Sequence, residues 1–342
     1  MTNVMGWDIG GVNTKAARIT SSGGEPVRTV SLPYAVQRDP GALPGVVSAA
    51  CQAVGAALDD DHAVTMTAEL SQVFRTKREG VGYILDALET VLPVERLFVY
   101  TVDGRFLRPL EARSAHLAVA ASNWAATANW VARQIESCVL IDIGTTSTDL
   151  IPIVDGRVVA RGRSDPERLL SGELVYTGAL RTPAEAVSAH LPLWGGQANV
   201  SADGFAIMGD AHRWLGRLSE EDYTCPAPDG RGASRHSAGE RLARMVCGDR
   251  EMLDDPAIDG IASALAAAQV STIAAALQRI RQRWPAIRLA AITGLGDFIG
   301  AEAARSVGLA VAPLEERLGP AARVAPAFAV AELLRDWLGS GR

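Results

Sequence analysis

The pattern of apolar and polar positions predicts one order of elements that occurs twice along the chain. In the first half, apolar runs on either side of a glycine turn predict strands at 4–7 and 15–20, a turn at 21–24 and a third strand at 27–32. Helical periodicity follows at 43–58, 80–91 and 112–136, with strands at 63–67 and 97–101 between these helices. The order restarts with strands at 137–143, 148–154 and 157–163, helices at 237–247 and 259–283, a strand at 289–293, and helices at 301–307 and 327–338.

This repeated order indicates the fold class and the domain boundaries. Antiparallel strands followed by helix–strand units, used twice, predict an α/β protein made of a duplicated domain, with a cleft between the two copies. The expected first domain is 1–136 and the second is 137–342. An irregular insertion is expected near 165–228, where Gly, Pro and Trp are frequent and the periodicity is lost.

Composition narrows the function classes. The chain has 342 residues, 48% of them hydrophobic and 21% charged, as in ordinary soluble globular proteins. A net charge of −6 argues against a general nucleic-acid binder. No secretory signal is visible, and polar residues interrupt the most apolar segment, 261–280, so we expect a cytoplasmic protein without a membrane span. The oligomeric state stays open.

The cysteines give no sign of a disulfide framework or of a metal centre. No two of them form a CxxC pair, so free thiols in a reducing compartment are expected at Cys51, Cys138, Cys225 and Cys247. A zinc site made by Cys225, His236 and Cys247 would fit no usual ligand spacing.

Two glycine turns carry the most specific chemistry. Aligning VMGWDIGGVNTKAARI (4–19) with VLIDIGTTSTDLIPI (139–153) pairs Asp8 with Asp142 and Gly10 with Gly144. The same alignment pairs Thr14 with Thr148 and Lys15 with Asp149. Glycines in such turns let backbone amides approach a phosphate and allow positive φ angles, and hydroxyl groups add donors. The candidate phosphate-binding residues are Gly10, Gly11, Asn13, Thr14, Gly144, Thr145, Thr146 and Ser147.

Charged residues at these turns suggest catalytic roles. Asp8 and Asp142 would hold Mg²⁺, which prefers oxygen ligands, and Lys15 would neutralise a phosphate oxygen. We therefore expect two hairpins that clamp a Mg²⁺-polyphosphate, with Asp142, Lys15 and Asp8 as candidate catalytic residues. Either aspartate, with Asp142 favoured, could instead accept a proton. Asp149 could orient Lys15 or a metal-bound water, or simply end a turn, and plain hairpins remain the alternative for both turns.

These turns resemble the phosphate loops of the acetate and sugar kinase/actin-like superfamily. The resemblance implies duplicated ribonuclease-H-like (actin-like ATPase) domains, with Gly294 and Gly296 as glycines on the nucleotide side. A narrower resemblance rests on MTAELSQVFRTKREGVGYIL (66–85), ASNWAATA (121–128), LIDIGTTSTDLIPI (140–153), RLLSGELVYTGALRTP (168–183) and RLARMVCGD (241–249). These segments are similar to hydantoinase/oxoprolinase-like proteins of the tetrahydromethanopterin-linked C1 transfer pathway, which are related to an archaeal enzyme of methanofuran biosynthesis.

The narrower resemblance implies a transferase of methanofuran or methylofuran biosynthesis. Such an enzyme joins an aminomethylfuran-methyl diphosphate to the phenol oxygen of a tyramine or tyrosine derivative and releases diphosphate. Mg²⁺ is the expected cofactor, and ATP is possible but not required. Two other functions stay open, because a phosphate clamp does not reveal whose phosphate it holds. One is an ATP-dependent small-molecule kinase or hydantoinase/oxoprolinase-type amide hydrolase, and the other is a non-catalytic nucleotide-binding protein.

The family motifs also suggest substrate-binding residues, each with a structural alternative. Glu69 could hold the ammonium group of the furan or act as a local cap. Lys77 and Arg78 could bind diphosphate or a substrate acid, or belong to a solvated face at the start of a helix near Gly80. The remaining candidates are Asn123 in the helix 112–136, and Ser171 and Glu173 at a capped helix start or an active-site edge. Trp124 is expected in the core, with stacking on the substrate as the alternative, and His190, His212 and His236 are expected to be structural or on the surface.

Overall fold

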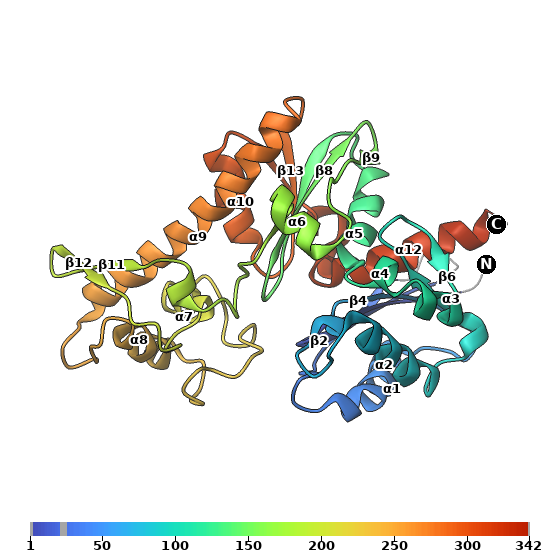
Figure 1. Ribbon diagram of the computed structural model, residues 1–342, viewed down its shortest axis with the longest axis horizontal. Helices are drawn as coiled ribbons and strands as arrows, with labels where there is room; N and C mark the ends of the chain where they lie inside the picture. Colours follow the sequence, from blue (N-terminus) through green and yellow to red (C-terminus); the bar gives the residue numbers. More distant parts are fainter. Residues whose placement is uncertain (1–2, 21–25, 341–342) are drawn as a thin grey trace. The chain divides into compact units, whose positions relative to one another are not determined.

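The computed structural model describes residues 3–20 and 26–340 (Figure 1). The turn expected at 21–24 lies outside these residues. The chain forms two compact units, each described by itself below. Unit 1 contains Met1–Leu140, Ile151–Leu170 and Pro313–Arg342, and unit 2 contains Ile141–Leu150 and Ser171–Ala312.

The first sheet has the strand order β3-β2-β1-β4-β5-β6. Its strands are β1 (Val4–Ile9), β2 (Asn13–Ile19), β3 (Arg28–Pro33), β4 (Asp61–Met66), β5 (Leu97–Tyr100) and β6 (Phe106–Leu107). The strands β1, β2 and β3 are antiparallel neighbours, whereas β4 is parallel to β1 and β5 is parallel to β4. Because β1 and β4 are parallel and in register from Val4 to Ile9, both end at the same edge of the sheet.

Helices cover this sheet on both faces, which explains why β1 is buried along its whole length. Met5, Trp7 and Ile9 pack into a core with α1 (Leu43–Val54) and α2 (Lys77–Glu89). The C-terminal helix α12 (Ala325–Gly339) contacts β1 and also α5 (Asn123–Ala132), so the end of the chain completes the fold of its beginning.

The second sheet has the order β10-β8-β7-β13-β14, and β9 also pairs with β8. Its strands are β7 (Cys138–Ile143), β8 (Thr148–Val154), β9 (Arg157–Val158), β10 (Leu174–Val175), β13 (Leu289–Thr293) and β14 (Ala310–Pro313). The strand β7 lies between its hairpin partner β8 and the distant β13, as β1 lies between β2 and β4. The expected duplication of a mixed α/β arrangement is confirmed.

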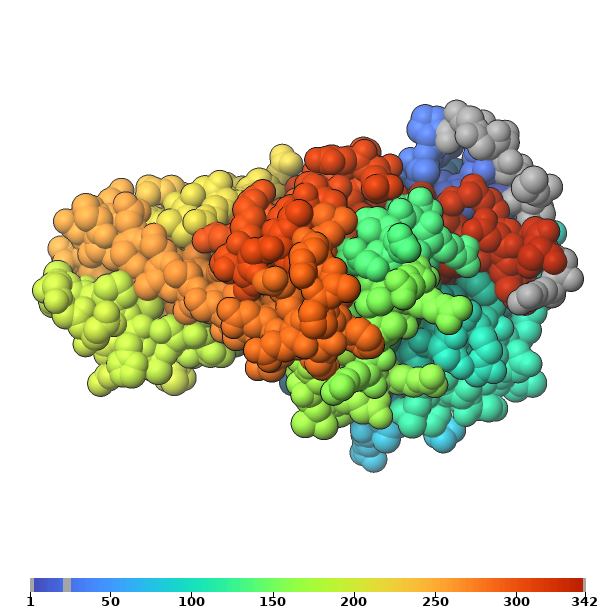
Figure 2. Space-filling view, turned by 90° about the horizontal axis from the view of Figure 1, so that it is seen from above, coloured from blue at the N-terminus to red at the C-terminus, as the bar shows by residue number. Residues whose placement is uncertain are grey.

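Unit 2 is organised around α9 (Asp255–Arg283), a helix of 29 residues. The helices α7 (Met208–Trp214), α8 (Arg235–Arg244) and α10 (Asp297–Ser306) contact it, as does β11 (His190–Leu193), which pairs with β12 (Gly196–Asn199). One side of α9 remains exposed, in orange in Figure 2. Among the described residues, α9 alone is long and apolar enough to cross a membrane, and half of its most apolar window is buried inside the protein.

Short elements complete the chain. The remaining α-helices are α3 (Pro109–Ser114), α4 (His116–Val119), α6 (Asp165–Ser171) and α11 (Glu315–Leu318). The 3₁₀ turns are η1 (Pro40–Ala42), η2 (Ala68–Leu70), η3 (Val94–Arg96), η4 (Ala184–Ala186) and η5 (Gly319–Val324).

Several local expectations were wrong. The strand expected at 157–163 covers only Arg157–Val158. The helix expected at 112–136 is broken, because Ala120 forms a parallel bridge with Met66 and Ala121 has a φ of 51°. The helix expected to begin near Gly80 begins at Lys77, since the Thr76 hydroxyl accepts a hydrogen bond from the Glu79 amide and caps it. Ser171 ends α6 rather than starting a helix, because Gly172 adopts a φ of 76°.

Candidate functional site

The two glycine turns have the same local structure. In the first, the Gly10 amide donates to the Asn13 carbonyl at 3.1 Å, and in the second the Gly144 amide donates to the Ser147 carbonyl at 3.0 Å. Both turns end a buried strand and begin its hairpin partner. The repeated device expected from the sequence is therefore present once in each unit.

Neighbouring segments fix the carbonyl groups of both turns. The Val36 amide donates to the Gly11 carbonyl, and the equivalent Thr145 carbonyl accepts from the amides of Leu180 and Arg181. Since the carbonyl and amide of one peptide unit point in opposite directions, the amide after each of these carbonyls faces away from its neighbouring segment.

The backbone amides of both turns are available to a ligand. Among the described residues, none accepts a hydrogen bond from these amides, which belong to Gly11, Val12, Thr145, Thr146 and Ser147. The residues are partly exposed. Consecutive amides without an acceptor can form a concave site for an anion, so phosphate binding by these turns stays a prediction.

The expectation that glycines in these turns adopt positive φ angles was wrong. Neither Gly10, Gly11 nor Gly144 has a positive φ. Each turn therefore needs no left-handed backbone, and a close approach requires glycine only at Gly10, where a Cβ would lie 2.6 Å from the Asn13 carbonyl oxygen.

The charged residues of the first turn lie on adjacent strands. Asp8 and Lys15 are opposite each other in the register of β1 and β2, and the Lys15 Nζ lies 4.0 Å from an Asp8 carboxylate oxygen. Asp8 is buried, whereas Lys15 is partly exposed. Thr14 is fully buried, so its hydroxyl belongs to the interior of the hairpin, while Asn13 is partly exposed.

The late glycine motif lies directly against the second turn. Gly294 has a φ of 95°, and a Cβ at this position would lie 2.6 Å from the Asp142 Oδ1. The Gly296 amide donates to the Ile143 carbonyl at 2.9 Å. The two glycines therefore pack against Asp142 and Ile143 of the second turn, and their place on the nucleotide side stays a prediction.

A buried hydrogen-bond relay supports the second turn, and sequence reasoning missed it. The Gln269 amide nitrogen donates to the Thr177 hydroxyl and to the Gly178 carbonyl, both at 2.8 Å. Gly178 packs so closely on Thr146 that a Cβ there would lie 2.5 Å from the Thr146 nitrogen. The Thr148 hydroxyl also donates to the Thr177 carbonyl at 2.6 Å.

His212 completes this relay from α7. Its Nε2 lies 2.9 Å from the Gln269 Oε1. Burial lowers the pKa of His212 to about 4, so the ring is neutral near pH 7. Because the Gln269 nitrogen is already a donor and its oxygen can only accept, the neutral ring carries its proton on Nε2.

Replacing Gln269 by leucine is expected to lower the free energy of unfolding by about 1–3 kcal/mol, because the buried Thr177, Gly178 and His212 groups lose their partner. Chemical denaturation would measure this, and amide exchange should become faster in 177–181. The exposed Gln278 on the same helix provides the control, Gln278→Leu. Equal stability of the two variants would contradict the relay.

A second group of charges lies in unit 1, at the end of β4. The Met66–Ile9 pairing and the hydrogen bond from the Thr67 amide to the Ile9 carbonyl place this end beside the first glycine turn. Glu69 follows in η2 and is 1% exposed. The Lys77 Nζ lies 3.8 Å from a Glu69 oxygen and 2.8 Å from an Asp165 oxygen.

Glu69 has an unusual titration. Burial raises the pKa of its carboxyl from 4.5 to about 7, although Lys77 and the backbone amides of Glu69 and Ala121 lower it. Within the part of the chain that the structure describes, neither carboxylate oxygen has a hydrogen-bond partner in regular geometry. The carboxylate is thus held in an environment that penalises its charge.

This environment predicts a pH-dependent effect of Glu69→Gln on stability. The folded-state pKa lies above the unfolded-state value, so the folded chain binds more protons between pH 4.5 and about 7. Wild-type stability is therefore lost over this range as pH rises, whereas the neutral glutamine does not titrate. We expect the variant to gain stability relative to wild type from pH 4.5 to 7, as measured by denaturation at a series of pH values. A constant difference would contradict the raised pKa.

Three of the family motifs meet in this group. Arg168 is 2% exposed, its guanidinium carbon lies 4.4 Å from the Trp124 ring centroid, and its Nη1 lies 3.8 Å from Asp165. Trp124 is buried, as expected for a core residue. We call Glu69, Lys77, Asp165, Arg168 and Trp124 the Glu69 cluster. Of the other candidates, Asn123 is partly exposed at the start of α5, and Arg78 is exposed on α2.

The candidates Ser171 and Glu173 lie in unit 2. The Ser171 hydroxyl donates to a Glu173 oxygen at 2.9 Å, and the Arg283 Nη1 lies 3.8 Å from the other oxygen. Glu173 is fully buried. The pair therefore joins the strand β10 to the end of α9, and its role in substrate binding stays a prediction.

The donor sets fit the expected magnesium ion better than zinc. Over residues 3–20 and 26–340, no group of at least three His, Cys, Asp or Glu side chains could hold a metal, which leaves no zinc site at Cys225, His236 and Cys247. Asp8 and Asp142 instead offer hard carboxylate oxygens beside turns that suit phosphate, and Mg²⁺ commonly needs few protein ligands because phosphate and water supply the rest.

Comparisons with known proteins agree with the resemblance inferred from the motifs. The chain is 36% identical over 337 residues to the (4-{4-[2-(gamma-L-glutamylamino)ethyl]phenoxymethyl}furan-2-yl)methanamine synthase of Methanocaldococcus jannaschii, covering 98% of both chains. It is 32% identical over 219 residues to the protein of the same name from Methanococcus vannielii, covering 62% of this chain and 98% of that protein.

Similarity to a solved structure supports the fold. A nucleotide-free acetone carboxylase structure superimposes with a TM-score of 0.55 at 11% identity, covering 96% of this chain and 70% of that one. Its similarity concerns the fold alone. The hydantoinase/oxoprolinase family profile matches residues 60–336, which include the Glu69 cluster and the second glycine turn. Together with 36% identity over 98% of the chain to the relative from Methanocaldococcus jannaschii, this match shows that the chain belongs to the hydantoinase/oxoprolinase family.

Proposed function

We propose that this chain forms the aryl ether bond of a methanofuran-type cofactor. The substrates are an aminomethylfuran-methyl diphosphate and the phenol of a tyramine or tyrosine derivative. The observation that carries the proposal is 36% identity along 98% of the chain to a relative whose name describes a phenoxymethyl-furan product. The two glycine turns support it, since each offers consecutive amides to a phosphate.

The reaction exchanges one C–O bond for another. The phenol oxygen attacks the methylene carbon of the furan substrate, and the bond from this carbon to the diphosphate oxygen breaks. The bonding electrons leave with the diphosphate, and the phenol proton passes to a base. Negative charge therefore grows on the diphosphate in the transition state, where fixed donors and cations lower the barrier most.

The residues of the turns suit these tasks. The amides of Gly11, Val12, Thr145, Thr146 and Ser147 would bind phosphate oxygens, and Lys15 would balance the growing charge. Asp8 and Asp142 would hold Mg²⁺, which when bound supplies positive charge for the leaving diphosphate. In the alternative assignment, only one aspartate holds the metal, and the other, with Asp142 favoured, takes the phenol proton.

The test is an incubation of the purified chain with Mg²⁺, the furan diphosphate and a series of phenols. Tyramine, tyrosine and their γ-glutamyl derivatives should be compared, with diphosphate release and ether formation as the readouts. Diphosphate release that depends on the phenol supports the proposal. ATP hydrolysis stimulated by a metabolite, without ether formation, would instead identify an ATP-dependent kinase or amide hydrolase. Nucleotide binding without any turnover would indicate a non-catalytic binding protein.

Small-molecule substrates also fit the rest of the proposal. A net charge of −6 and soluble substrates favour action in the cytoplasm, without nucleic acid or membrane as partner. The chain could act alone or as an oligomer, which size-exclusion chromatography with light scattering would establish.

A further inference from the structure

Glu69 is a buried carboxyl group whose hydrogen-bonding capacity is largely unused. It is 1% exposed, and the backbone amides of Glu69 and Ala121, which lie close enough to lower its pKa, do not reach its oxygens in regular hydrogen-bond geometry. Burying a carboxylate with so few donors is strongly unfavourable, so native proteins rarely keep one unless it has a partner in the working state. The neighbouring cation Lys77 does not donate a hydrogen bond to this carboxylate.

Lys77 is committed to another carboxylate. Its Nζ lies 2.8 Å from Asp165, which is hydrogen-bonding distance, but 3.8 Å from Glu69, which is too long for a hydrogen bond. Lys77 thus attracts the Glu69 carboxylate electrostatically but donates no hydrogen bond to it. Its side chain is 21% exposed, whereas the Glu69 side chain is 0% exposed, so the lysine is the outer member of the pair.

The segments 69–71 and 121–124 contain further buried polar atoms that lack partners among the described residues. These atoms are the hydroxyls of Ser71 and Ser122 and the Trp124 Nε1. Ala121, directly before Ser122, adopts a φ of 51°, a left-handed conformation that is strained for a non-glycine residue. Unused polar groups and backbone strain in one place are typical of a ligand site rather than of a purely structural core.

Charge decides what kind of group would bind. The neighbouring Arg168 guanidinium lies over Trp124 and near Asp165, so the side chains of the cluster carry two positive and two negative charges when Glu69 is ionised. A further anion would meet Glu69 at close range and be repelled. A primary ammonium has the same chemistry as the Lys77 head group and can take its place beside Glu69, adding the hydrogen bonds that Lys77 does not make.

We propose that Glu69 binds the primary ammonium of the furan substrate, while Lys77 remains with Asp165. This inference rests on the proposed function, because the product named for the relatives is a methanamine and its amine is charged near neutral pH. The Met66–Ile9 pairing puts the site beside the first glycine turn. Neighbouring segments of unit 1 can therefore bind the amine and the diphosphate of one furan substrate. Glu69 is then a specificity-determining residue.

Replacing Glu69 should change the selectivity between substrates rather than lower the activity on all of them. Wild type should prefer the aminomethyl substrate over a hydroxymethyl analogue by at least about 10²-fold in kcat/KM, because a buried charge that loses its partner is heavily penalised. Glu69→Gln should reduce this ratio to within about tenfold, chiefly through the amine substrate. Glu79→Gln, at an exposed position on α2, is the matched control and should keep the wild-type ratio. If Glu69 had only a structural role, Glu69→Gln would lower kcat/KM equally for both substrates, and that result would overturn the inference.

A binding measurement separates this inference from the proposed reaction. Calorimetry with 2-(aminomethyl)furan and 2-(hydroxymethyl)furan requires no turnover. Wild type should bind the amine more tightly than the alcohol, and Glu69→Gln should lose this difference. Lys77→Gln should bind the amine more tightly than wild type, because the resident cation no longer competes for Glu69. Glu69-dependent amine binding without ether formation would contradict the proposed reaction but support the ammonium site. Equal binding of amine and alcohol by wild type would contradict the ammonium site.

Discussion

Replacing Asp142 by asparagine is expected to lower the turnover of ether formation by at least about 10²-fold while the chain stays folded. Asparagine keeps the size of the side chain but removes its charge, so it can neither accept the phenol proton nor hold Mg²⁺ as strongly. The position tolerates little change in shape, because Gly294 leaves only enough space for the Asp142 oxygen beside it. Steady-state kinetics with the furan diphosphate would measure the loss.

Controls distinguish charge from structure in this experiment. Asp155→Asn removes a carboxylate from an exposed turn with a φ of 51°, which asparagine adopts readily, and should leave turnover unchanged. Lys15→Ala should reproduce the loss of at least about 10²-fold, since it removes a cation that balances the leaving diphosphate. Near-normal kinetics in both Asp142→Asn and Lys15→Ala would reject the assignment of the turns.

The parts of the site that could be predicted from sequence are those made within one short segment. Each glycine turn is closed by a hydrogen bond across four residues, Gly10–Asn13 and Gly144–Ser147, so its local pattern was sufficient. The strand 289–293 was also predicted with its observed bounds, because an apolar run meets a glycine directly after it.

The parts that could not be predicted depend on contacts between distant segments. Gln269 meets Thr177 across 92 positions, and on its own helix it is merely a polar residue in an apolar run. Lys77 meets Asp165 across 88 positions, so the sequence suggested Lys77 and Glu69 as candidates but gave no reason to include Asp165. The alanine-rich run near Ala121 reads as a continuous helix, and only the bridge between Ala120 and Met66 reveals the break.

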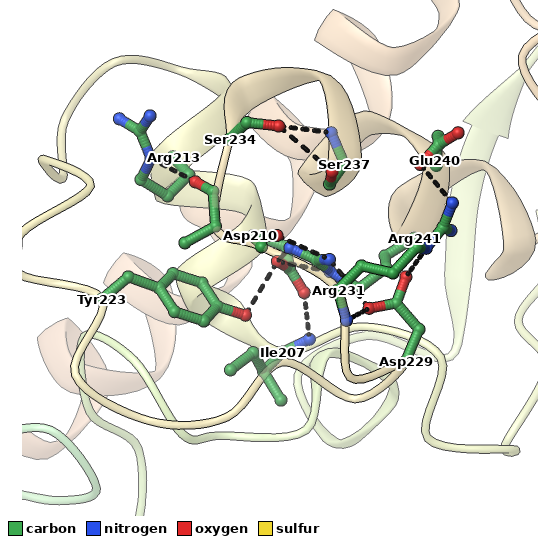
Figure 3. A network of polar contacts seen from close by, with 12 residues as sticks. Ile207, Asp210, Arg213, Tyr223, Asp229, Arg231, Ser234, Ser237, Glu240 and Arg241 are labelled. Atoms are coloured by element: carbon green, nitrogen blue, oxygen red, sulfur yellow. Dashed lines mark hydrogen bonds and ion pairs between the residues drawn. The ribbon is translucent and has the colours of Figure 1, made fainter.

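Removing the guanidinium of Arg241 should cause the largest loss of stability. Arg241 and Asp210 are both fully buried, and the Arg241 Nη2 lies 2.7 Å from an Asp210 oxygen (Figure 3). The Tyr223 hydroxyl and the Ile207 amide also donate to Asp210, and Arg241 holds Asp229 at 3.0 Å. This network ties the irregular segment around 223–232 to the helices α7 and α8.

Arg241→Ala is expected to lower the free energy of unfolding by about 3–5 kcal/mol, because it leaves the Asp210 charge buried without its cation. Chemical denaturation would measure this, with Arg244→Ala at an exposed position of the same helix as the control. The double variant Arg241→Met with Asp210→Asn removes both charges and should recover much of the loss, since the penalty comes from the unpaired anion rather than from the missing bond. If the double variant were instead as unstable as the sum of its single variants, packing and not charge would be what the network provides, and the loop at 223–232 would owe its position to shape alone.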